Sequence, residues 1–304
     1  MTFRKVVSVL TVFLALSGKI LAIQDKFNVL MVGIDGCRPD ALLVADTPNI
    51  DKLWHNGAYS FHVKSDTISY SGPCWTSILT GVWHQKHNVI SNNYSKPNIE
   101  QYPHIFSLLK KSNKNRECIS VVRWAPINKI MLPESGLKFN YKKDQRVSNE
   151  SISILRVMLN IDIMFIHLGE VDSIGHKSGF SVKKNSNYIK QIQKTDILIG
   201  EILSALELRQ KARNENWVII LTTDHGGVAF DHGQNIDAHT NTFFIVSGKN
   251  IKKGEINTQV NAVDIGVTVL DLLGVSIEKS WNLDGKVIDL KKSKDPVKKI
   301  KNRF

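Results

Sequence analysis

Four short runs of apolar residues stand out along the chain, and each has the length of a buried strand. They are Asn28–Ile34, Ile161–Leu168, Trp217–Leu221 and Phe243–Val246. The runs are nearly continuous rather than alternating, which is typical of strands that are covered on both faces. The pattern therefore predicts a sheet buried between two layers.

Segments with helical periodicity lie between these strands. We expect helices over Thr47–Asn56, Pro73–Val82, His104–Lys111, Ser181–Arg213 and Ala262–Leu273. The last is followed by Gly274, a residue that suits the left-handed conformation at helix ends. Strand–helix alternation predicts an α/β fold with a mostly parallel central sheet and helices on both faces.

Acidic residues follow three of the apolar runs. Asp35 comes directly after the first run, Asp172 follows the second after a short Gly-Glu-Val link, and Asp224 follows the third. In open α/β sheets the ligand site lies at the carboxyl ends of the strands, so these three acids should meet at one edge. Their mutual repulsion calls for a positive partner, and a metal ion is the obvious candidate.

Histidines accompany these acids. His176 lies four residues after Asp172, which places both on one side of a helical turn, and His225 is adjacent to Asp224. His232 and His239 follow at intervals of seven residues. Mixed Asp/His ligation suits zinc or manganese better than calcium or magnesium. A single histidine of this kind is more often a turn or core residue, but the whole set favours a metal site.

A serine precedes the second expected helix. Pro73 fits the first helical position, which places Ser71 at or just before the helix N-terminus. A hydroxyl there lies beside unpaired backbone N–H groups and the positive end of the helix dipole, where an anion or an alkoxide is stabilised. The alternative is that Ser71 only caps the helix.

Residues 1–22 have the layout of a secretory signal peptide. Arg4 and Lys5 precede an 11-residue apolar run, Val6–Leu16, and Ala22 offers a small residue at a cleavage position. The run is shorter than the roughly 20 apolar residues that span a bilayer. We expect a secreted, periplasmic or otherwise extracytoplasmic protein, with an uncleaved N-terminal anchor as the alternative.

Composition and charge exclude several classes of protein. Of 304 residues, 42% are hydrophobic and 22% are charged, which is a globular balance and not that of a disordered, collagen-like or coiled-coil chain. Three cysteines, Cys37, Cys74 and Cys118, exclude a disulfide scaffold and leave at least one unpaired within the chain. The net charge is 40 − 28 = +12. The basic tail 291–304 carries no interleaved aromatic residues before its end, so we expect a solvated segment or a contact with an anionic surface, and no nucleic-acid recognition.

These motifs together resemble the alkaline phosphatase superfamily, and within it the type I phosphodiesterase/nucleotide pyrophosphatase family. The matching segments are VGIDGCRPDAL from Val32, TPNIDKL from Thr47, SGPCWTSILTGVWHQKHNVISNN from Ser71, EVDSIGHKSG from Glu170 and TTDHGG from Thr222. The resemblance implies an alkaline-phosphatase-like sandwich. It also implies a catalytic domain over 23–290, between the signal peptide and the tail.

The resemblance implies two metal ions, usually zinc, with manganese as the alternative. By residue match, Asp35, Asp224 and His225 would hold one ion, with Ser71 completing the site. The other would be held by Asp172, His176 and a third histidine, for which we favour His232 over His239.

The implied reaction is hydrolysis of a small phosphate ester or nucleotide through a phospho-serine. Ser71 would be the nucleophile, activated by metal coordination. Asn92, 21 residues later, matches the asparagine that stabilises phosphoryl oxygen in nucleotide pyrophosphatases, and the Gly72 N–H would assist it. The family generally has Thr at the position of Ser71 and Asn at that of Cys74, and the role of Cys74 stays open between packing, pairing with Cys37 and a thiol near the pocket.

Three other functions compete with this interpretation of the motifs. A phosphomonoesterase would need a cation, such as Arg123 or Lys86, to clamp the additional phosphate charge. A sulfatase shares the fold but requires Cys/Ser-x-Pro-x-Arg, and Trp75 stands in place of that arginine. A non-catalytic metal-binding protein would lack turnover. The sequence favours a two-metal phosphodiesterase or nucleotide pyrophosphatase.

Overall fold

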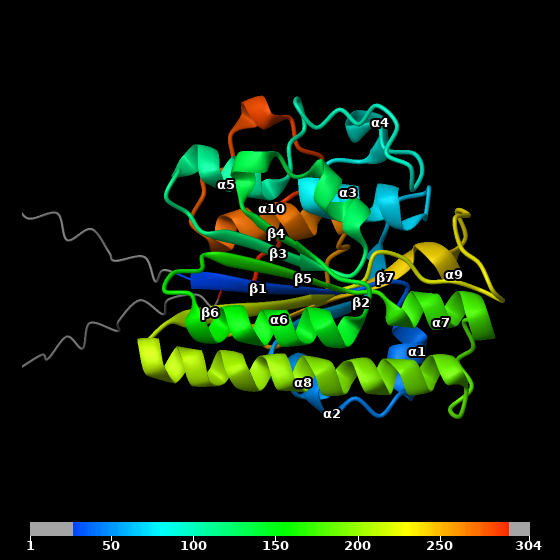
Figure 1. Cartoon of the computed structure of the whole chain (residues 1–304). Coiled ribbons are helices and arrows are strands. Elements are labelled where there is room, and N and C mark those ends of the chain that lie inside the picture. Colours follow the sequence, from blue (N-terminus) through cyan, green and yellow to red (C-terminus); the bar gives the residue numbers. More distant parts are fainter. Residues whose placement is uncertain (1–26, 292–304) are drawn as a thin grey trace, which may run out of the picture.

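The structure is a computed structural model, and it describes residues 27–291. One mixed sheet of eight strands forms its centre, in the order β4-β3-β5-β1-β6-β7-β2-β8 (Figure 1). The strands are β1 (Phe27–Ile34), β2 (Ala58–Lys64), β3 (Cys118–Val122), β4 (Leu137–Asn140), β5 (Ile163–Leu168), β6 (Asn216–Thr222), β7 (Asn241–Gly248) and β8 (Gly254–Glu255). The predicted signal peptide and all of the basic tail after Lys291 lie outside the described residues.

Helices cover both faces of the sheet, as the alternation predicted (Figure 1). One layer contains α3 (Ser71–Thr80), α4 (His84–His87), α5 (Ile105–Ser112) and α10 (Ala262–Leu272). The other contains α1 (Pro39–Val44), α2 (Pro48–Asn56), α6 (Asp144–Val157) and α8 (Asn187–Arg213). Two further helices, α7 (Glu170–Ser178) and α9 (Asp237–Thr240), lie at one end of the sheet. Three 3-10 turns cover Ala125–Ile130, Pro133–Ser135 and Lys279–Trp281.

The sheet is mostly parallel, but β7 runs against both of its neighbours. The central strands β5, β1 and β6 are parallel and adjacent. All six residues of β5 and all eight of β1 are buried, which explains their continuous apolar sequence. The run Phe243–Val246 is a strand as predicted, and it runs antiparallel to β6. The segment 223–240 between the two strands contains only the four-residue helix α9.

Most expected helices are present with shifted ends. The long helix α8 begins at Asn187, where Ser186 caps it, instead of at Ser181. The second helix begins at Ser71, so Pro73 occupies its third position and not its first. Helix α6 and strands β2, β3 and β4 were not predicted. Among the described residues, no helix combines the length and the apolar character needed to cross a membrane.

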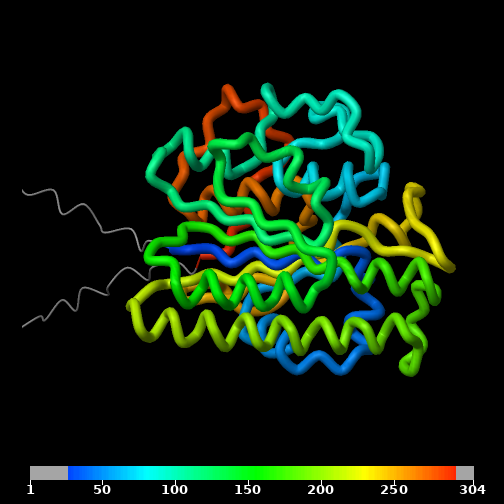
Figure 2. Tube along the Cα trace, in the orientation of Figure 1, coloured from blue at the N-terminus to red at the C-terminus, as the bar shows by residue number. Residues whose placement is uncertain are grey.

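The path of the chain brings distant segments to one end of the sheet (Figure 2). The carboxyl ends of β1, β5 and β6 lie together there because these strands are parallel neighbours. Helices α7 and α9 and the start of α3 lie around the same end (Figure 1). The fold therefore places the three acid-bearing segments side by side.

Candidate active site

The first cluster at this end of the sheet contains Asp35, Asp224, His225 and Ser71. One ligating atom from each of Asp35, Asp224 and His225 lies within 4.8 Å of the others, and all three residues are buried. His225 Nε2 is 3.4 Å from Asp35 Oδ1 and 3.2 Å from Asp224 Oδ2. Ser71 Oγ lies 3.1 Å from His225 Nε2 and 3.4 Å from Asp35 Oδ1. The serine hydroxyl therefore adjoins a buried set of metal-ligating side chains.

A second cluster contains Asp172, His176 and His232. Asp172 Oδ1 lies 3.5 Å from His176 Nε2 and 3.7 Å from His232 Nε2, and the two imidazole nitrogens are 3.0 Å apart. Asp231 forms a further group with His176 and His232 and is a candidate ligand that was not predicted from the sequence. The structure thus brings together the residues expected at a second metal site.

The two clusters adjoin each other. The rings of His225 and His232 stack with their centroids 3.7 Å apart. Gly36, which follows Asp35, has a φ of 64°, and a Cβ there would lie 2.8 Å from Asp172 Oδ1. A glycine at this turn is what lets the end of β1 approach α7 so closely.

The imidazole rings of three histidines are oriented in the same way, with Nδ1 toward a backbone carbonyl. His225 Nδ1 donates to Gly226 O at 2.7 Å, His232 Nδ1 donates to Ser69 O at 2.8 Å, and His176 Nδ1 donates to Phe230 O at 2.8 Å. A backbone carbonyl only accepts, so each Nδ1 carries the proton and each Nε2 keeps its lone pair. All three Nε2 atoms face the clusters. This is how histidine ligands are held for a metal.

His239 has the opposite arrangement. Its Nδ1 accepts a hydrogen bond from Gln234 N at 3.1 Å, so the proton of the neutral ring is on Nε2. In the described part of the chain, none of the groups of metal-ligating side chains includes His239. His239 is buried in α9, and its Nε2 has no partner there. The geometry therefore favours His232 over His239 as the third histidine.

Burial and mutual repulsion set the pKa values of the acids. Burial raises the pKa of Asp224 well above its usual range, and the charge of Asp35 raises it further. The same two causes raise the pKa of Asp172. Burial by itself would raise the pKa of Asp35 too. The hydrogen bond and the charge of His167 have a larger effect in the other direction and hold the Asp35 pKa well below its usual value. Three carboxyl groups of this kind need cations to be charged together.

Burial keeps His225 and His232 neutral in this environment. Burial lowers the pKa of His225 to about 3, and the neighbouring His232 adds to the effect. Burial also lowers the pKa of His232. Neutral imidazole is the form that binds a metal.

The donor atoms in both clusters fit divalent metal ions. Among the described residues, Asp172 Oδ1 and Asp224 Oδ2 are buried atoms without a hydrogen-bond partner. Each faces histidine Nε2 atoms that carry lone pairs. Acceptors that face acceptors are unfavourable in a buried site unless a cation lies between them. Carboxylate and imidazole donors in this mixture suit zinc or a similar transition metal.

Ser71 is the first residue of α3 and is not its cap. Tyr70 occupies the capping position, and the Ser71 hydroxyl points instead to Asp35 and His225. The Gly72 N–H donates to Asn92 Oδ1 at 2.8 Å. This corrects the expected role of Gly72, because its N–H orients Asn92 and is not free for a substrate oxygen. The amide group of Asn92 is then the donor left for a ligand.

Two contacts to Asp35 were not predicted. His167 Nε2 donates to Asp35 Oδ2 at 2.8 Å, and Trp75 Nε1 donates to the same oxygen at 2.9 Å. The signal that could have indicated His167 is an imidazole inside the apolar run of β5, where a polar side chain needs a partner. From the sequence, Trp75 is notable only as the residue in place of the sulfatase arginine.

The three cysteines are free and buried. Cys74 therefore does not pair with Cys37 in this structure. Burial raises the pKa of both thiols far above the usual range, so they stay protonated near neutral pH. Of the three expected alternatives for Cys74, packing agrees best with its complete burial in α3.

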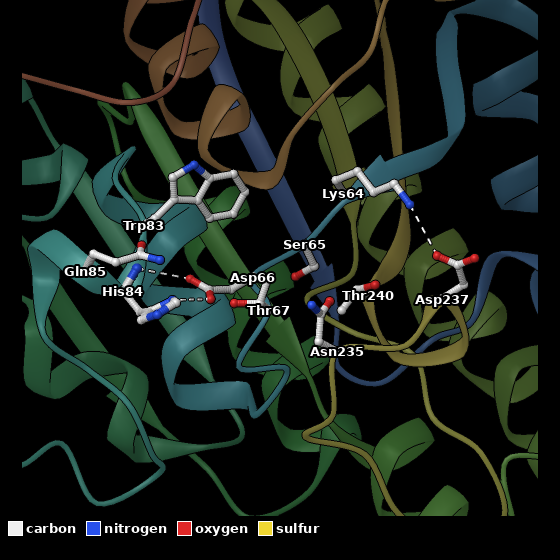
Figure 3. A pocket seen from close by; sticks show the side chains of 10 residues that line it. All are labelled: Lys64, Ser65, Asp66, Thr67, Trp83, His84, Gln85, Asn235, Asp237 and Thr240. Atoms are coloured by element: carbon white, nitrogen blue, oxygen red, sulfur yellow. Dashed lines mark hydrogen bonds and ion pairs between the residues drawn. The ribbon is translucent and has the colours of Figure 1, made fainter.

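A cavity of about 440 Å³ lies beside the segment that leads to Ser71 (Figure 3). It is lined by Lys64, Ser65, Asp66, Thr67, Trp83, His84, Gln85, Asn235, Asp237 and Thr240. The buried Asp66 accepts hydrogen bonds from the His84 ring at 2.5 Å and from the Ser77 hydroxyl at 2.7 Å. Since Ser77 lies in α3, Asp66 ties the segment before Ser71 to that helix.

Comparison with known proteins identifies the family of the chain. The family model for type I phosphodiesterase/nucleotide pyrophosphatase matches residues 29–127 and 120–263. Mouse ectonucleotide pyrophosphatase/phosphodiesterase family member 7 is 22% identical over 229 residues, or 67% of this chain and 51% of the relative. Human bis(5′-adenosyl)-triphosphatase is 24% identical over 246 residues, or 71% and 52%. The chain thus spans about half the length of the curated relatives that it matches.

Solved structures show the same fold. Murine ectonucleotide pyrophosphatase/phosphodiesterase 5, an inactive form in complex with AMP, superimposes with a TM-score of 0.67 at 15% identity, over 83% of this chain and 96% of that one. A 2-O glycosaminoglycan sulfatase gives a TM-score of 0.71 at 15% identity, over 87% and 73%. The expected alkaline-phosphatase-like fold is confirmed. Because the family model matches the chain from β1 into α10, the chain belongs to the type I phosphodiesterase/nucleotide pyrophosphatase family.

Proposed function

We propose that this protein is a secreted hydrolase of phosphoric esters, a phosphodiesterase or nucleotide pyrophosphatase that acts through a phospho-serine on Ser71. The observation that carries the proposal is the orientation of three histidines. His176, His225 and His232 each donate Nδ1–H to a backbone carbonyl and turn an unprotonated Nε2 toward buried carboxylates. Ser71 Oγ lies 3.1 Å from one of these Nε2 atoms.

Two divalent ions, of which zinc is favoured and manganese is the alternative, would lower the pKa of the serine hydroxyl and of water and balance the charge of the reacting oxygens. Asp35, Asp224 and His225 would hold one ion beside Ser71. Asp172, His176 and His232 would hold the other. The unpartnered oxygens of Asp172 and Asp224 support these assignments.

The chain's own residues then have the following roles. The proton of the Ser71 hydroxyl passes to solvent as Oγ attacks phosphorus; a Ser71–phosphorus bond forms, the bond from phosphorus to the leaving oxygen breaks, and the leaving oxygen takes up a proton from solvent. Water then attacks the phospho-serine and gives up a proton to solvent, the bond to Ser71 Oγ breaks to release phosphate or a phosphate monoester, and Ser71 Oγ regains a proton. Asn92, held by Gly72 through its Oδ1, presents its amide N–H groups to the phosphoryl oxygens.

Small nucleotides are the proposed substrates. Relatives of this chain are named as a bis(5′-adenosyl)-triphosphatase, and one structural neighbour is in complex with AMP. The extracytoplasmic location rests on the signal-peptide pattern of residues 1–22.

The deciding experiment compares an aryl phosphodiester with the matching phosphomonoester after zinc loading. We expect the diester to be turned over faster. Ser71→Ala should reduce turnover by several orders of magnitude, and a reaction quenched in acid should carry a phosphoryl group on the peptide that contains Ser71. Thr67→Ala is the control, because Thr67 lies exposed on the same segment. Full turnover by Ser71→Ala contradicts the proposal.

A phosphomonoesterase is the second candidate, and Arg123 is the observation that favours it. Arg123 follows β3, and its side chain is 26% exposed. Its Nε lies 3.8 Å from Asp144 Oδ1, a longer distance than the Lys86 ion pair, and its Nη1 donates to Gly169 O at 3.0 Å, at the start of the helix that carries Asp172. Lys86 is not available for this role, because its Nζ is paired with Asp284 at 2.6 Å. If Arg123 clamps the extra phosphate charge, Arg123→Ala will lower monoester turnover more than diester turnover.

A further inference from the structure

One carboxylate oxygen of Asp35 accepts hydrogen bonds from two residues that lie in different layers of the fold. Trp75 Nε1 in α3 donates to Oδ2 at 2.9 Å, and His167 Nε2 in β5 donates to the same atom at 2.8 Å. Both side chains are completely buried. Neither belongs to the groups of metal-ligating residues found in the described chain.

The two oxygens of Asp35 therefore have different surroundings. Oδ2 accepts two N–H groups, whereas Oδ1 faces Ser71 Oγ and His225 Nε2, each at 3.4 Å. Two donors on one oxygen fix the plane of the carboxylate and leave the other oxygen for the cluster.

The ring of His167 is oriented opposite to those of the three candidate ligand histidines. Its Nε2 must carry the proton in order to donate to a carboxylate, and its Nδ1 is buried without a partner in the described structure. His225, by contrast, donates through Nδ1 and keeps the lone pair on Nε2. His167 is therefore placed to hold a ligand and not to be one.

The backbone is shaped to admit this pair. Gly33 in β1 is the register partner of His167 in β5. A Cβ at Gly33 would lie 2.2 Å from the Trp75 ring, so only glycine lets the indole reach the end of the sheet. The Trp75 and His167 rings then meet edge to face with their centroids 5.3 Å apart. Three segments thus share one packed contact around Asp35.

We propose that Trp75 and His167 are positioning residues that make Asp35 a single-oxygen ligand, by holding Oδ2 so that only Oδ1 is presented to the metal beside Ser71. This rests on the proposed function in needing a metal at the first cluster. Partners that orient a ligand in this way commonly change metal affinity by about 10–100-fold.

The test measures metal binding separately from turnover. The full chain is stripped of metal and titrated with zinc against a chromogenic chelator. Trp75→Phe removes the indole N–H and keeps an aromatic ring. His167→Gln keeps an N–H donor that reaches as far as Nε2, whereas His167→Asn is equally polar but too short to reach Asp35.

We expect Trp75→Phe and His167→Asn to weaken one of the two zinc equivalents by about 10–100-fold. At zinc concentrations that refill the site, kcat should stay reduced while KM is little changed. The reason is that these variants misalign Ser71 but leave substrate binding intact. His167→Gln should restore much of the affinity that His167→Asn loses. A role in stability alone would not produce this difference between two amides.

Trp217→Phe is the matched control. Trp217 is also a buried tryptophan whose Nε1 donates to a carboxylate, Glu215, at 2.8 Å, but it lies at the start of β6, away from the carboxyl ends of the strands. Its replacement should lower the free energy of unfolding without changing zinc affinity.

Unchanged affinity for both zinc equivalents in Trp75→Phe and His167→Asn overturns the proposal. If Trp75→Phe or His167→Asn fails to fold, the zinc affinity of His167→Gln is compared with that of the wild-type protein. A fall in the affinity of His167→Gln to that of an Asp35→Ala protein also overturns the proposal. Failure of the proposed hydrolase is seen differently. In that case wild-type zinc binding and its dependence on His167 persist, while Ser71→Ala has no effect on turnover.

Discussion

The backbone N–H of Gly72 donates a 2.8 Å hydrogen bond to Oδ1 of Asn92 and so joins the residue after Ser71 to a loop 20 positions later. A Cβ at Gly72 would lie 2.6 Å from Ser91 O and 3.1 Å from Asn92 Oδ1. The close approach fixes the asparagine relative to the serine. The amide donors of Asn92 are therefore set before a substrate binds.

Asn92→Ala should lower kcat by about 10²–10³-fold, the usual cost of losing one donor to a developing oxyanion. Asn92→Asp should be at least as damaging, because it keeps the acceptor for Gly72 but replaces the donors with negative charge. Steady-state kinetics with an aryl diester measures both. Asn93→Ala is the control, since Asn93 Oδ1 bonds only to Ser91 and Ser95 within the loop. An Asn92→Asp protein of wild-type activity would contradict this role.

The two clusters should lose metal independently. Asp224→Ala should remove one zinc equivalent from the site beside Ser71, and Asp172→Ala should remove the other, because each loses an oxygen that has no other partner. Elemental analysis of the purified variants is the measurement. Retention of two equivalents by both proteins would rule out these assignments.

His232→Ala should weaken zinc binding far more than His239→Ala. His232 Nε2 keeps its lone pair and lies 3.0 Å from His176 Nε2, whereas Nδ1 of His239 is occupied as an acceptor for Gln234 N–H. Zinc titration of the two alanine proteins compares them directly. The reverse order of affinities would show that His239 is the third ligand.

Asp66→Ala should lower the free energy of unfolding by about 3 kcal/mol, because it leaves the partly buried imidazole of His84 and the buried hydroxyl of Ser77 without their acceptor. Asp66 is buried, and it bonds the ring of His84 and the hydroxyl of Ser77. Urea denaturation gives the difference. Asp237→Ala, which removes a 91% exposed carboxylate from the rim of the same cavity, should leave stability almost unchanged.

Stability should fall as the pH drops below about 6.5, in part because of His104. Burial lowers the pKa of His104 from 6.5 to about 3, so the unfolded chain binds a proton in this range while the folded chain does not. The loss approaches about 1.4 kcal/mol per pH unit between these two values and stops below the lower one.

His104→Asn should reduce this slope. Asn can replace the His104 Nδ1 atom that accepts from Phe106 N at the start of α5, but it does not titrate. The measurement is the free energy of unfolding at pH 7 and pH 5 for both proteins. An equal slope in the two proteins would assign the acid sensitivity to other groups, among them His87, whose pKa burial lowers to about 4.

Local pattern alone predicted the central strands and the residues that follow them. The strands β1, β5 and β6 are apolar because both of their faces are covered, and this shows in the sequence as continuous apolar runs. Asp35 and Asp224 follow β1 and β6 closely in the chain, so they must lie at the ends of these strands. The four-residue spacing of Asp172 and His176 fixes them on one side of α7. Such features depend on neighbours in sequence, so they can be recognised without a structure.

Other elements gave no such signal. Strand β2 is only partly buried, and β4 has no fully buried residue, so neither has the apolar run that identifies a central strand. Helix α6 is rich in polar residues and shows its buried stripe only against α8 and the sheet. The direction of β7 is also invisible in its own sequence, because an apolar strand reads the same when it runs antiparallel.

The sequence by itself determined that acids, histidines and a serine with the order and spacing of a metal-dependent esterase are present on an α/β sheet. Only the tertiary structure decided how they are oriented: that His232 and not His239 turns an unprotonated nitrogen to the site, and that Asn92 takes the Gly72 N–H. It also showed Trp75 and His167 on Asp35. The physical reason is that ring orientation and hydrogen-bond direction depend on which groups packing brings within about 3 Å. Except for Gln234, which lies five residues before His239, these partners are between 20 and 163 residues apart in the chain.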